Sequence, residues 1–343
     1  MRIVVDVSPL SHPRTGVGNY IRGSLVGLAG TGHEVVAFAP ASRTGRRLIE
    51  AALDGVDLER RLPALPAAHA LRTAWSRLRH PALERFVGAF DVFHFSDWMY
   101  PPQRRGLRST MVHDLVPLHH PQWVHPRTRR MHGAKYAHAA RTCDVVMVNS
   151  RFTGDDVAAT LGVASERIHV AYPGVDAVYT PDGARAGGDY VLVVGTLEPR
   201  KNLDVAIAAV RDRELRVVGG RGWGGVEARG ATVSWLGPLH DEDLARQYRG
   251  AAAFVYPSRF EGFGMPVVEA MACGVPVVAS SHPSLDEASG DAAIRADPDD
   301  PEALAAAVAD AIARREELVP RGLEHARRFT WSANARAHVE AWS

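Results

Sequence analysis

The chain has 343 residues, of which 46% are hydrophobic and 23% are charged. This length fits two α/β domains of roughly 150–180 residues each, and the apolar content excludes an intrinsically disordered protein. No apolar run approaches the roughly 20 residues that cross a bilayer, and the first residues, MRIVVDVSPL, lack the long apolar segment of a signal peptide. We therefore expect a cytoplasmic protein. Its two cysteines, Cys143 and Cys273, should stay reduced and cannot form a metal site by themselves.

The net charge of +1 is unevenly distributed along the chain. Residues 1–183 carry 22 Lys and Arg against 16 Asp and Glu, whereas residues 184–343 carry 18 against 23. Within the basic half, residues 70–86 (ALRTAWSRLRHPALERF) mix arginine with Leu, Trp and Phe. Two interpretations stay open for this segment: a surface helix in peripheral contact with an anionic membrane, or an ordinary solvated helix. A near-neutral chain argues against a nucleic-acid partner.

Short β-branched runs alternate with helical patterns along the whole chain, which predicts parallel sheets with crossover helices. Residues 181–189 are rich in Gly, Pro and small residues without an apolar period, and we interpret them as a linker between domains 1–180 and 190–330. Residues 303–318 and 331–343 read as helices. The expected strands are Ile3–Val7, Glu34–Ala39, Val92–Phe95, Thr110–Val112, Val145–Val148, Ile168–Val170, Tyr190–Val194, Leu215–Val218, Val233–Leu236, Ala253–Tyr256 and Val275–Ala279.

The most informative segment is 256–278, YPSRFEGFGMPVVEAMACGVPVV, which reads as strand, glycine turn, short helix, glycine and strand. The unpaired N–H groups at the start of such a helix form an anion site. Glu269, about one turn into the helix, could accept a hydrogen bond from a sugar hydroxyl beside that anion. Glu261 precedes the turn on the other side. An anion flanked by two carboxylates suits a nucleotide-sugar.

Arg200 and Lys201 follow the first expected strand of the second domain. Fixed cations and helix starts are one way in which enzymes stabilise a departing diphosphate, and a divalent metal is the other. Arginine offers a forked pair of bonds and lysine a point charge. Two exposed residues at a helix start would be the alternative interpretation of this pair.

Three other patterns do not indicate a cofactor or a metal. The G-x-G at 16–18 has Ile21 in place of a third glycine, and strand two ends without the acid that binds a nicotinamide ribose, so we exclude NAD. His119, His120 and His125 have no common metal-ligand spacing and indicate an acceptor-facing loop. The acids of 241–243 are typical of a helix start, which the macrodipole favours.

Six ordered segments resemble retaining GT-B glycosyltransferases of glycosyltransferase family four: 13–20 (PRTGVGNY), 113–121 (HDLVPLHHP), 149–153 (NSRFT), 172–176 (YPGVD), 195–203 (GTLEPRKNL) and the E-x7-E signature within 261–278. The resemblance covers most of the chain. It implies two Rossmann-like domains that face each other across a deep cleft, with the C-terminal helix 331–343 packed back on the first domain. It also implies a nucleotide-sugar donor as substrate, no metal and no other cofactor.

The resemblance also implies roles for individual residues. The catalytic set would be His113, Arg200, Lys201 and Glu261. The donor-binding set would be Gly16, Val17, Gly18, Thr196, Leu236, Gly237, Phe263, Gly264, Met265 and Glu269, with 16–18 forming a flexible loop over the diphosphate. The acceptor side would include Asp114, His119, Asn149 and Arg151. Thr196 stands where some family members have an arginine, and residues 281–289 (SHPSLDEAS) depart from the family's pattern.

The resulting hypothesis is transfer of a hexose, first mannose from GDP-mannose, to a hydroxyl of a glycan, lipid-linked or small-molecule acceptor. The bacterial mannosyltransferases are the members that PRTGVGNY and GTLEPRKNL resemble most. Two alternatives stay open: a nucleotide-sugar 2-epimerase of GT-B shape, and a non-catalytic sugar- or membrane-binding protein. The four intact charged residues of the second domain argue against the latter.

Overall fold

The computed structural model describes residues 1–13, 15–64, 71, 75, 80–95 and 100–343. The chain divides into two compact units. The first contains Met1–Leu115, Arg127–Gly174 and Trp331–Ser343, and the second contains Val116–Pro126 and Val175–Thr330. The expected domains differ from these units in two places: residues 116–126 belong to the second unit, and the boundary follows Gly174 rather than residue 180.

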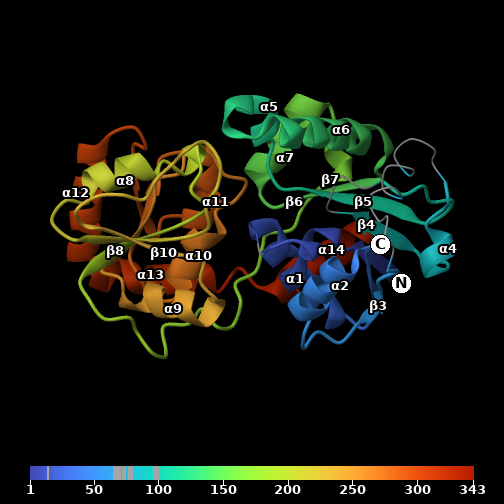
Figure 1. The fold of residues 1–343 in the computed structure, drawn as a ribbon, viewed down its shortest axis with the longest axis horizontal. Coiled ribbons are helices and arrows are strands. Elements are labelled where there is room, and N and C mark those ends of the chain that lie inside the picture. The colour runs from blue at the N-terminus through green and yellow to red at the C-terminus, as the bar shows by residue number, and fades with distance from the viewer. Residues whose placement is uncertain (14, 65–70, 72–74, 76–79, 96–99) are drawn as a thin grey trace. The chain divides into compact units, whose positions relative to one another are not determined.

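The first unit is built on a seven-stranded sheet in which every pair of neighbours is parallel. The strands are, in sheet order, β3 (Glu59–Arg61), β2 (Glu34–Phe38), β1 (Arg2–Asp6), β4 (Val92–Phe95), β5 (Leu107–Val112), β6 (Val145–Val148) and β7 (Ile168–Val170). The longer helices are α1 (Gly16–Ala29), α2 (Arg43–Ala52), α6 (Pro126–Thr142), α7 (Arg151–Leu161) and α14 (Trp331–Trp342). Figure 1 shows α6 and α7 on one face of this sheet and α1, α2 and α14 on the other. The order 3-2-1-4 is that of a Rossmann sheet, in which the direction of crossover reverses beside β1.

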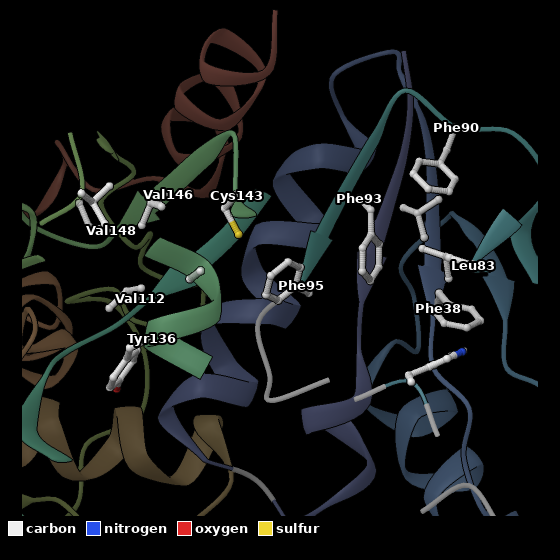
Figure 2. Close-up of a cluster of buried hydrophobic side chains, with 14 of the residues drawn as sticks. Phe38, Leu83, Phe90, Phe93, Phe95, Val112, Tyr136, Cys143, Val146 and Val148 are labelled. Atoms are coloured by element: carbon white, nitrogen blue, oxygen red, sulfur yellow. The ribbon is translucent and has the colours of Figure 1, made fainter. Parts of the chain in front are cut away.

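The sheet was predicted from short apolar runs in the sequence, and the side chains of these runs form its core. On the α6 and α7 face, buried side chains of the strands meet Tyr136 and Val157 from the helices and Cys143, which directly follows α6. Figure 2 shows this cluster, with Phe93 and Phe95 of β4 at its centre. Strands buried on both faces read as continuous apolar runs, which is why most of them were predictable from the sequence.

The C-terminal helix α14 packs against α1 at two glycines of α1. A Cβ at Gly23 would lie 2.0 Å from the Trp331 ring, and a Cβ at Gly27 would lie 2.1 Å from the Trp331 backbone oxygen. Asn334 adds hydrogen bonds to the Tyr20 hydroxyl at 2.9 Å and to the carbonyl of Tyr172 at 2.8 Å. The close approach of the two backbones therefore depends on glycine.

We expect Gly27→Ala to lower the free energy of unfolding by roughly 1–3 kcal/mol, because the new methyl group must displace the backbone of α14. Gly133→Ala is the matched control, since Gly133 also lies in a helix and nothing lies within 4 Å of an added Cβ. Alanine there should be neutral or slightly stabilising. Thermal unfolding of both variants checks this, and equal midpoints would contradict it.

The second unit contains a six-stranded sheet, again with only parallel pairs. The strands are, in sheet order, β10 (Val233–Gly237), β9 (Glu214–Val218), β8 (Tyr190–Val194), β11 (Ala253–Tyr256), β12 (Val277–Ser280) and β13 (Ala293–Ala296). The helices are α5 (Val116–His119), α8 (Leu203–Ala209), α9 (Asp241–Gly250), α10 (Met265–Ala272), α11 (Asp286–Ser289), α12 (Pro301–Ala313) and α13 (Arg315–Ala326). Figure 1 shows α8 and α12 on one face of the sheet and α9, α10 and α13 on the other. The crossover direction reverses between β8 and β11, which is where open α/β sheets bind ligands.

The sequence did not predict all of these elements. Strands β3 and β13 are edge strands, and their sequences, ERR and AIRA, lack the apolar run of a buried strand. The single helix expected over 303–318 is two helices, α12 and α13, which are separated at Arg314. Pro320 lies inside α13, so the helix continues past the residue at which a stop would be expected.

The segment 70–86 is only partly within the described residues, and Arg72, Arg77 and Arg79 lie outside them. The apolar residues that are described belong to the core of the first unit: Trp75 is 1% exposed, and Leu71 and Phe86 pack against that core. Contact of the arginine-rich segment with an anionic membrane stays a prediction. Among the described helices, none combines the length and the apolarity that a membrane crossing needs.

Candidate functional site

The strand-order reversal of the second unit brings two loops together. The chain leaves β8 into a single 3-10 turn, Pro199–Lys201, and leaves β11 into the loop that carries Glu261. Asn202 ends the 3-10 turn in the left-handed conformation, with φ 56°, and its amide donates to the carbonyl of Pro257 at 3.2 Å. The N–H of Arg259 in turn donates to the carbonyl of Arg200 at 2.9 Å.

Glu261 joins the two predicted cations. One of its oxygens accepts from Lys201 Nζ at 2.6 Å and the other from Arg200 at 2.7 Å. A second carboxylate, Glu198, binds Arg200 at 3.1 Å. The side chain of Glu261 is 9% exposed and that of Lys201 is 14% exposed, so this is a largely buried cluster of two cations and two carboxylates.

The cluster keeps Glu261 ionised. Burial alone would raise the pKa of this carboxyl, but Arg200 and Lys201 lower it to about 2. Burial and the neighbouring Arg200 lower the pKa of Lys201, while Glu261 opposes this effect. The Lys201 ammonium has three donors. Two of them bind Glu261 and the hydroxyl of Tyr256, and within the described residues the third has no partner.

Three residues that the sequence did not single out hold Glu261 and Lys201 in place. Ser258 donates to the Glu261 carboxylate at 2.5 Å, and Ser284 accepts from the Glu261 N–H at 3.0 Å. Tyr256 lies under Lys201, with the ammonium 5.0 Å from the ring centroid. Ser284 belongs to 281–289, the stretch that departs from the family's pattern, and it nevertheless contacts the signature loop. Of these contacts, the one from Ser258 could have been expected from the sequence, because Ser258 lies in the same loop as Glu261.

The predicted helix start follows directly. Gly264 precedes α10 with φ 102°, and a Cβ there would lie 2.5 Å from Leu285, so only glycine fits. Phe263 is buried against Phe329, and Met265 is the first helical residue. Glu269 is 8% exposed and accepts from the Tyr248 hydroxyl at 3.1 Å. The buried Tyr248 thereby orients the carboxylate expected to bind a ribose.

The remaining donor-side residues of the second unit lie at the carboxyl ends of β8 and β10. Thr196 is exposed one residue after Gly195, and Leu236 is 36% exposed near the end of β10. Gly237 ends β10 with φ 69° and its carbonyl accepts from the Gly219 N–H at 3.0 Å.

In the first unit, the expected glycine loop is instead the first turn of a helix. α1 begins at Gly16, and the Thr15 side chain caps it by accepting from the Gly18 N–H at 3.1 Å. The prediction of a flexible loop at 16–18 is therefore wrong, because Thr15 supplies an N-cap immediately before it. Nothing lies within 4 Å of a Cβ built on Gly16. The backbone N–H groups of Gly16 and Val17 then lie at a helix start, where they can bind an anion. A glycine loop is not needed for that role.

His113 follows β5 in the same unit. Its ring meets Tyr20 edge to face, with centroids 4.9 Å apart, and its Nε2 is buried with no hydrogen-bond partner among the described residues. Burial, and then the nearby Lys135 charge, lower its pKa to about 3. The imidazole is therefore neutral at physiological pH.

The other predicted acceptor-side residues are divided between the units. Asp114 uses its backbone carbonyl to accept from the Tyr136 hydroxyl at 2.8 Å. Asn149 is 8% exposed, and its Oδ1 is buried without a partner among the described residues. Arg151 is exposed at the start of α7. His119 belongs to the second unit, where its ring lies 6.2 Å from that of Phe260.

Within the described ranges no group of three or more His, Cys, Asp or Glu residues could hold a metal ion. Both cysteines are buried and unpaired.

Comparison with known proteins identifies the class. Solved GT-B glycosyltransferases share this fold over nearly the whole chain. Sucrose-phosphate synthase from Thermosynechococcus elongatus has a TM-score of 0.71 at 20% identity, with 99% of this chain and 98% of that chain covered. The Anabaena protein HepE, in complex with UDP-glucose, has a TM-score of 0.68 at 18% identity and covers 99% and 98%. The fold is therefore GT-B.

The family follows from the sequence comparisons. Residues 14–179 match Glycosyltransferase Family 4, and residues 188–314 match Glycosyl transferases group 1. O-antigen chain mannosyltransferase B of Escherichia coli is 30% identical over 100% of this chain and 99% of its own. D-inositol 3-phosphate glycosyltransferase of Paenarthrobacter aurescens is 25% identical over 98% and 96%. The chain belongs to glycosyltransferase family four, as its motifs indicated.

We expect Glu261→Gln to lower the free energy of unfolding by roughly 3–5 kcal/mol, because it leaves two buried cations without this carboxylate. Adding Lys201→Met should recover at least about 1 kcal/mol of that loss, since it removes one uncompensated charge. Glu302→Gln is the control: its partner Arg211 and Glu302 itself are 64% and 76% exposed, and such a pair contributes little. The measurement is chemical unfolding at pH 7. Additive effects of the two cluster substitutions would contradict the geometry.

The neutral state of His113 can be observed directly. Its pKa in the folded chain is lowered to about 3, so its ring signals in a ¹⁵N-histidine NMR titration should not shift between pH 8 and pH 5. His113→Gln assigns the signals by their disappearance. A midpoint between pH 6 and pH 7 would show that the ring is solvated and charged in the folded protein.

Proposed function

We propose that this protein is a retaining, metal-independent hexosyltransferase that moves a hexose from a nucleotide-sugar to a hydroxyl of a glycan, lipid-linked or small-molecule acceptor. The observation that carries the proposal is the Lys201 ammonium at the strand-order reversal of the second sheet. Glu261 and Tyr256 accept two of its hydrogen bonds, and its third donor has no partner in the part of the chain that the structure describes. A donor fixed at that place suits the leaving oxygen of a nucleoside diphosphate.

Mannose is the sugar we favour. The relative that is 30% identical over its full length is named a mannosyltransferase. The nucleotide-sugar class is supported by structural neighbours crystallised with UDP and with UDP-glucose. Other relatives carry the name D-inositol 3-phosphate glycosyltransferase, so acceptors differ among proteins of similar sequence.

The proposed mechanism uses fixed charge rather than a side-chain nucleophile. As the bond between the sugar and the diphosphate breaks, negative charge grows on the leaving oxygen, and Lys201 and Arg200 stabilise it in a largely buried environment. The start of α10 presents partial positive charge to the same diphosphate. The acceptor hydroxyl then attacks from the face that the diphosphate leaves, and a phosphate oxygen takes its proton. The neutral imidazole of His113 is suited to a hydroxyl of the donor sugar.

Glu269 provides a test of donor binding. Since a hydrogen bond to a charged group contributes about 1.5–3 kcal/mol, Glu269→Ala should weaken nucleotide binding on the order of tenfold to a hundredfold. Glu269→Gln keeps an acceptor for the Tyr248 hydroxyl and separates a binding loss from a folding defect. Calorimetric titration with the nucleoside diphosphate measures the change, with Glu302→Ala as the distant control. Unchanged affinity in both Glu269 variants would defeat the assignment.

Lys201 should act differently from Glu269. If its third donor binds the leaving oxygen, Lys201→Ala lowers kcat more than it raises KM for the donor. The reverse pattern would mean that Lys201 only binds the ground state.

The activity itself is tested by incubating the protein with a panel of nucleotide-sugars, with and without acceptors, in the presence of a chelator. Glycosyl transfer to an acceptor with an unchanged anomeric configuration, read from the anomeric proton by NMR, supports the proposal. An epimerised donor without acceptor would instead establish the 2-epimerase. Activity that requires an added divalent ion would disprove the metal-independent mechanism.

A further inference from the structure

A cavity of about 210 Å³ lies next to the proposed phosphate site in the second unit. Its lining comes from the loops that follow β8 and β9 and from β10, and it includes Leu197, Arg221, Gly222 and Trp235. A space of this size is suited to one planar ring system rather than to a whole nucleotide.

The cavity exists because the connection from β9 to β10 contains no helix. Parallel strands are usually joined by a crossover helix that covers the sheet. Here residues 219–232, all of them described, form turns and loop only, and six of them are glycines. The connection lies flat against the loop after β8: a Cβ at Gly222 would lie 2.5 Å from the carbonyl of Leu197, and one at Gly224 would lie 2.6 Å from Pro199.

The same packing places the cavity beside the cation cluster. The Leu197 N–H donates to the Gly220 carbonyl at 3.1 Å, and Leu197 is followed directly by Glu198 and by the turn that carries Arg200 and Lys201. A ligand whose diphosphate binds these cations would therefore have this cavity within reach of its other end.

Two side chains give the cavity its chemistry. Trp235 is 37% exposed, and its indole N–H donates to the Gly219 carbonyl at 2.9 Å, which fixes the ring. The Arg221 guanidinium lies over that ring, 5.1 Å from its centroid. Within the described residues no carboxylate pairs with Arg221. Stacking uses the face of a guanidinium and leaves its in-plane N–H donors for a ligand.

We infer that this cavity binds the nucleobase of the donor and that Arg221 makes it selective for guanine. Guanine presents two adjacent acceptors, N7 and O6, which match the forked donors of arginine. Adenine presents an amino donor in place of O6, which would face the guanidinium unfavourably. Uracil offers only one carbonyl at the corresponding edge and a smaller ring for stacking on Trp235. The inference rests on the proposed function, and it names the nucleotide that the same site selects.

The experiment measures the affinity of the full chain for GDP, UDP and ADP by calorimetry. The wild type should bind GDP at least tenfold more tightly than UDP or ADP. Arg221→Met should weaken GDP binding about tenfold to a hundredfold and change UDP binding less than threefold. Arg211→Met is the matched control, since Arg211 is an arginine of the same unit that does not line the cavity, is 64% exposed and pairs with Glu302. Thermal unfolding confirms that each variant is folded.

Three outcomes would overturn the inference: a wild type that prefers UDP or ADP, an Arg221→Met variant that loses GDP and UDP affinity equally, and an Arg221→Met variant that keeps full GDP affinity. The second would make Arg221 a phosphate ligand. Each of these leaves the proposed glycosyl transfer intact. Failure of the wild type to bind any of the three nucleotides would count instead against the nucleotide-sugar donor.

Discussion

The buried ion cluster around Glu261 is the constraint on which the rest of the second unit's site depends. Lys201 and Arg200 leave water only because this carboxylate accepts from both of them. Neither cation would be stable at this depth alone, since removing one partner of a buried pair is strongly destabilising. The cluster also joins the loops after β8 and β11, the two central strands at which the sheet changes direction. The ion pairs of Glu261 with Arg200 and Lys201 thus neutralise the buried charges and also hold the two loops together.

This balance has a consequence for binding. Two carboxylates already neutralise the two cations, so the cluster has little net charge to attract a diphosphate from a distance. Attraction must come from groups that the carboxylates do not satisfy: the third donor of Lys201 and the partial charge at the start of α10. Both act only at short range. These groups therefore act on a diphosphate that is already bound. They can stabilise the negative charge that develops on it during the reaction.

The sequence predicted the local elements around Glu261 better than the contacts between them. The glycine turn, the helix after it and the adjacent cations were predictable, because each rests on local rules for caps and strand ends. That Glu261 would bind both Arg200 and Lys201 was not, since the residues are about sixty positions apart and only the strand order brings them together. Residues 16–18 show the opposite error. Their glycines suggested a mobile loop, but Thr15 caps them into a helix. Edge strands β3 and β13 were missed because strands at a sheet's margin need no apolar run.

The charged cluster that would stabilise the diphosphate and the cavity that would bind the base lie at different strands of this sheet, and the fold explains why. The charged cluster sits on β8 and β11, which have neighbours on both sides and are held by the core. The base cavity sits against β10, the edge strand, under a connection without helical structure. A connection of this kind can change length and side chains without disturbing the sheet, because only one strand depends on it. Gly219 marks the boundary between the two parts: a Cβ there would lie 2.0 Å from the Gly195 carbonyl, so the backbone can vary only beyond it. Selectivity for the base can then differ between related chains while the groups that stabilise the diphosphate stay in place.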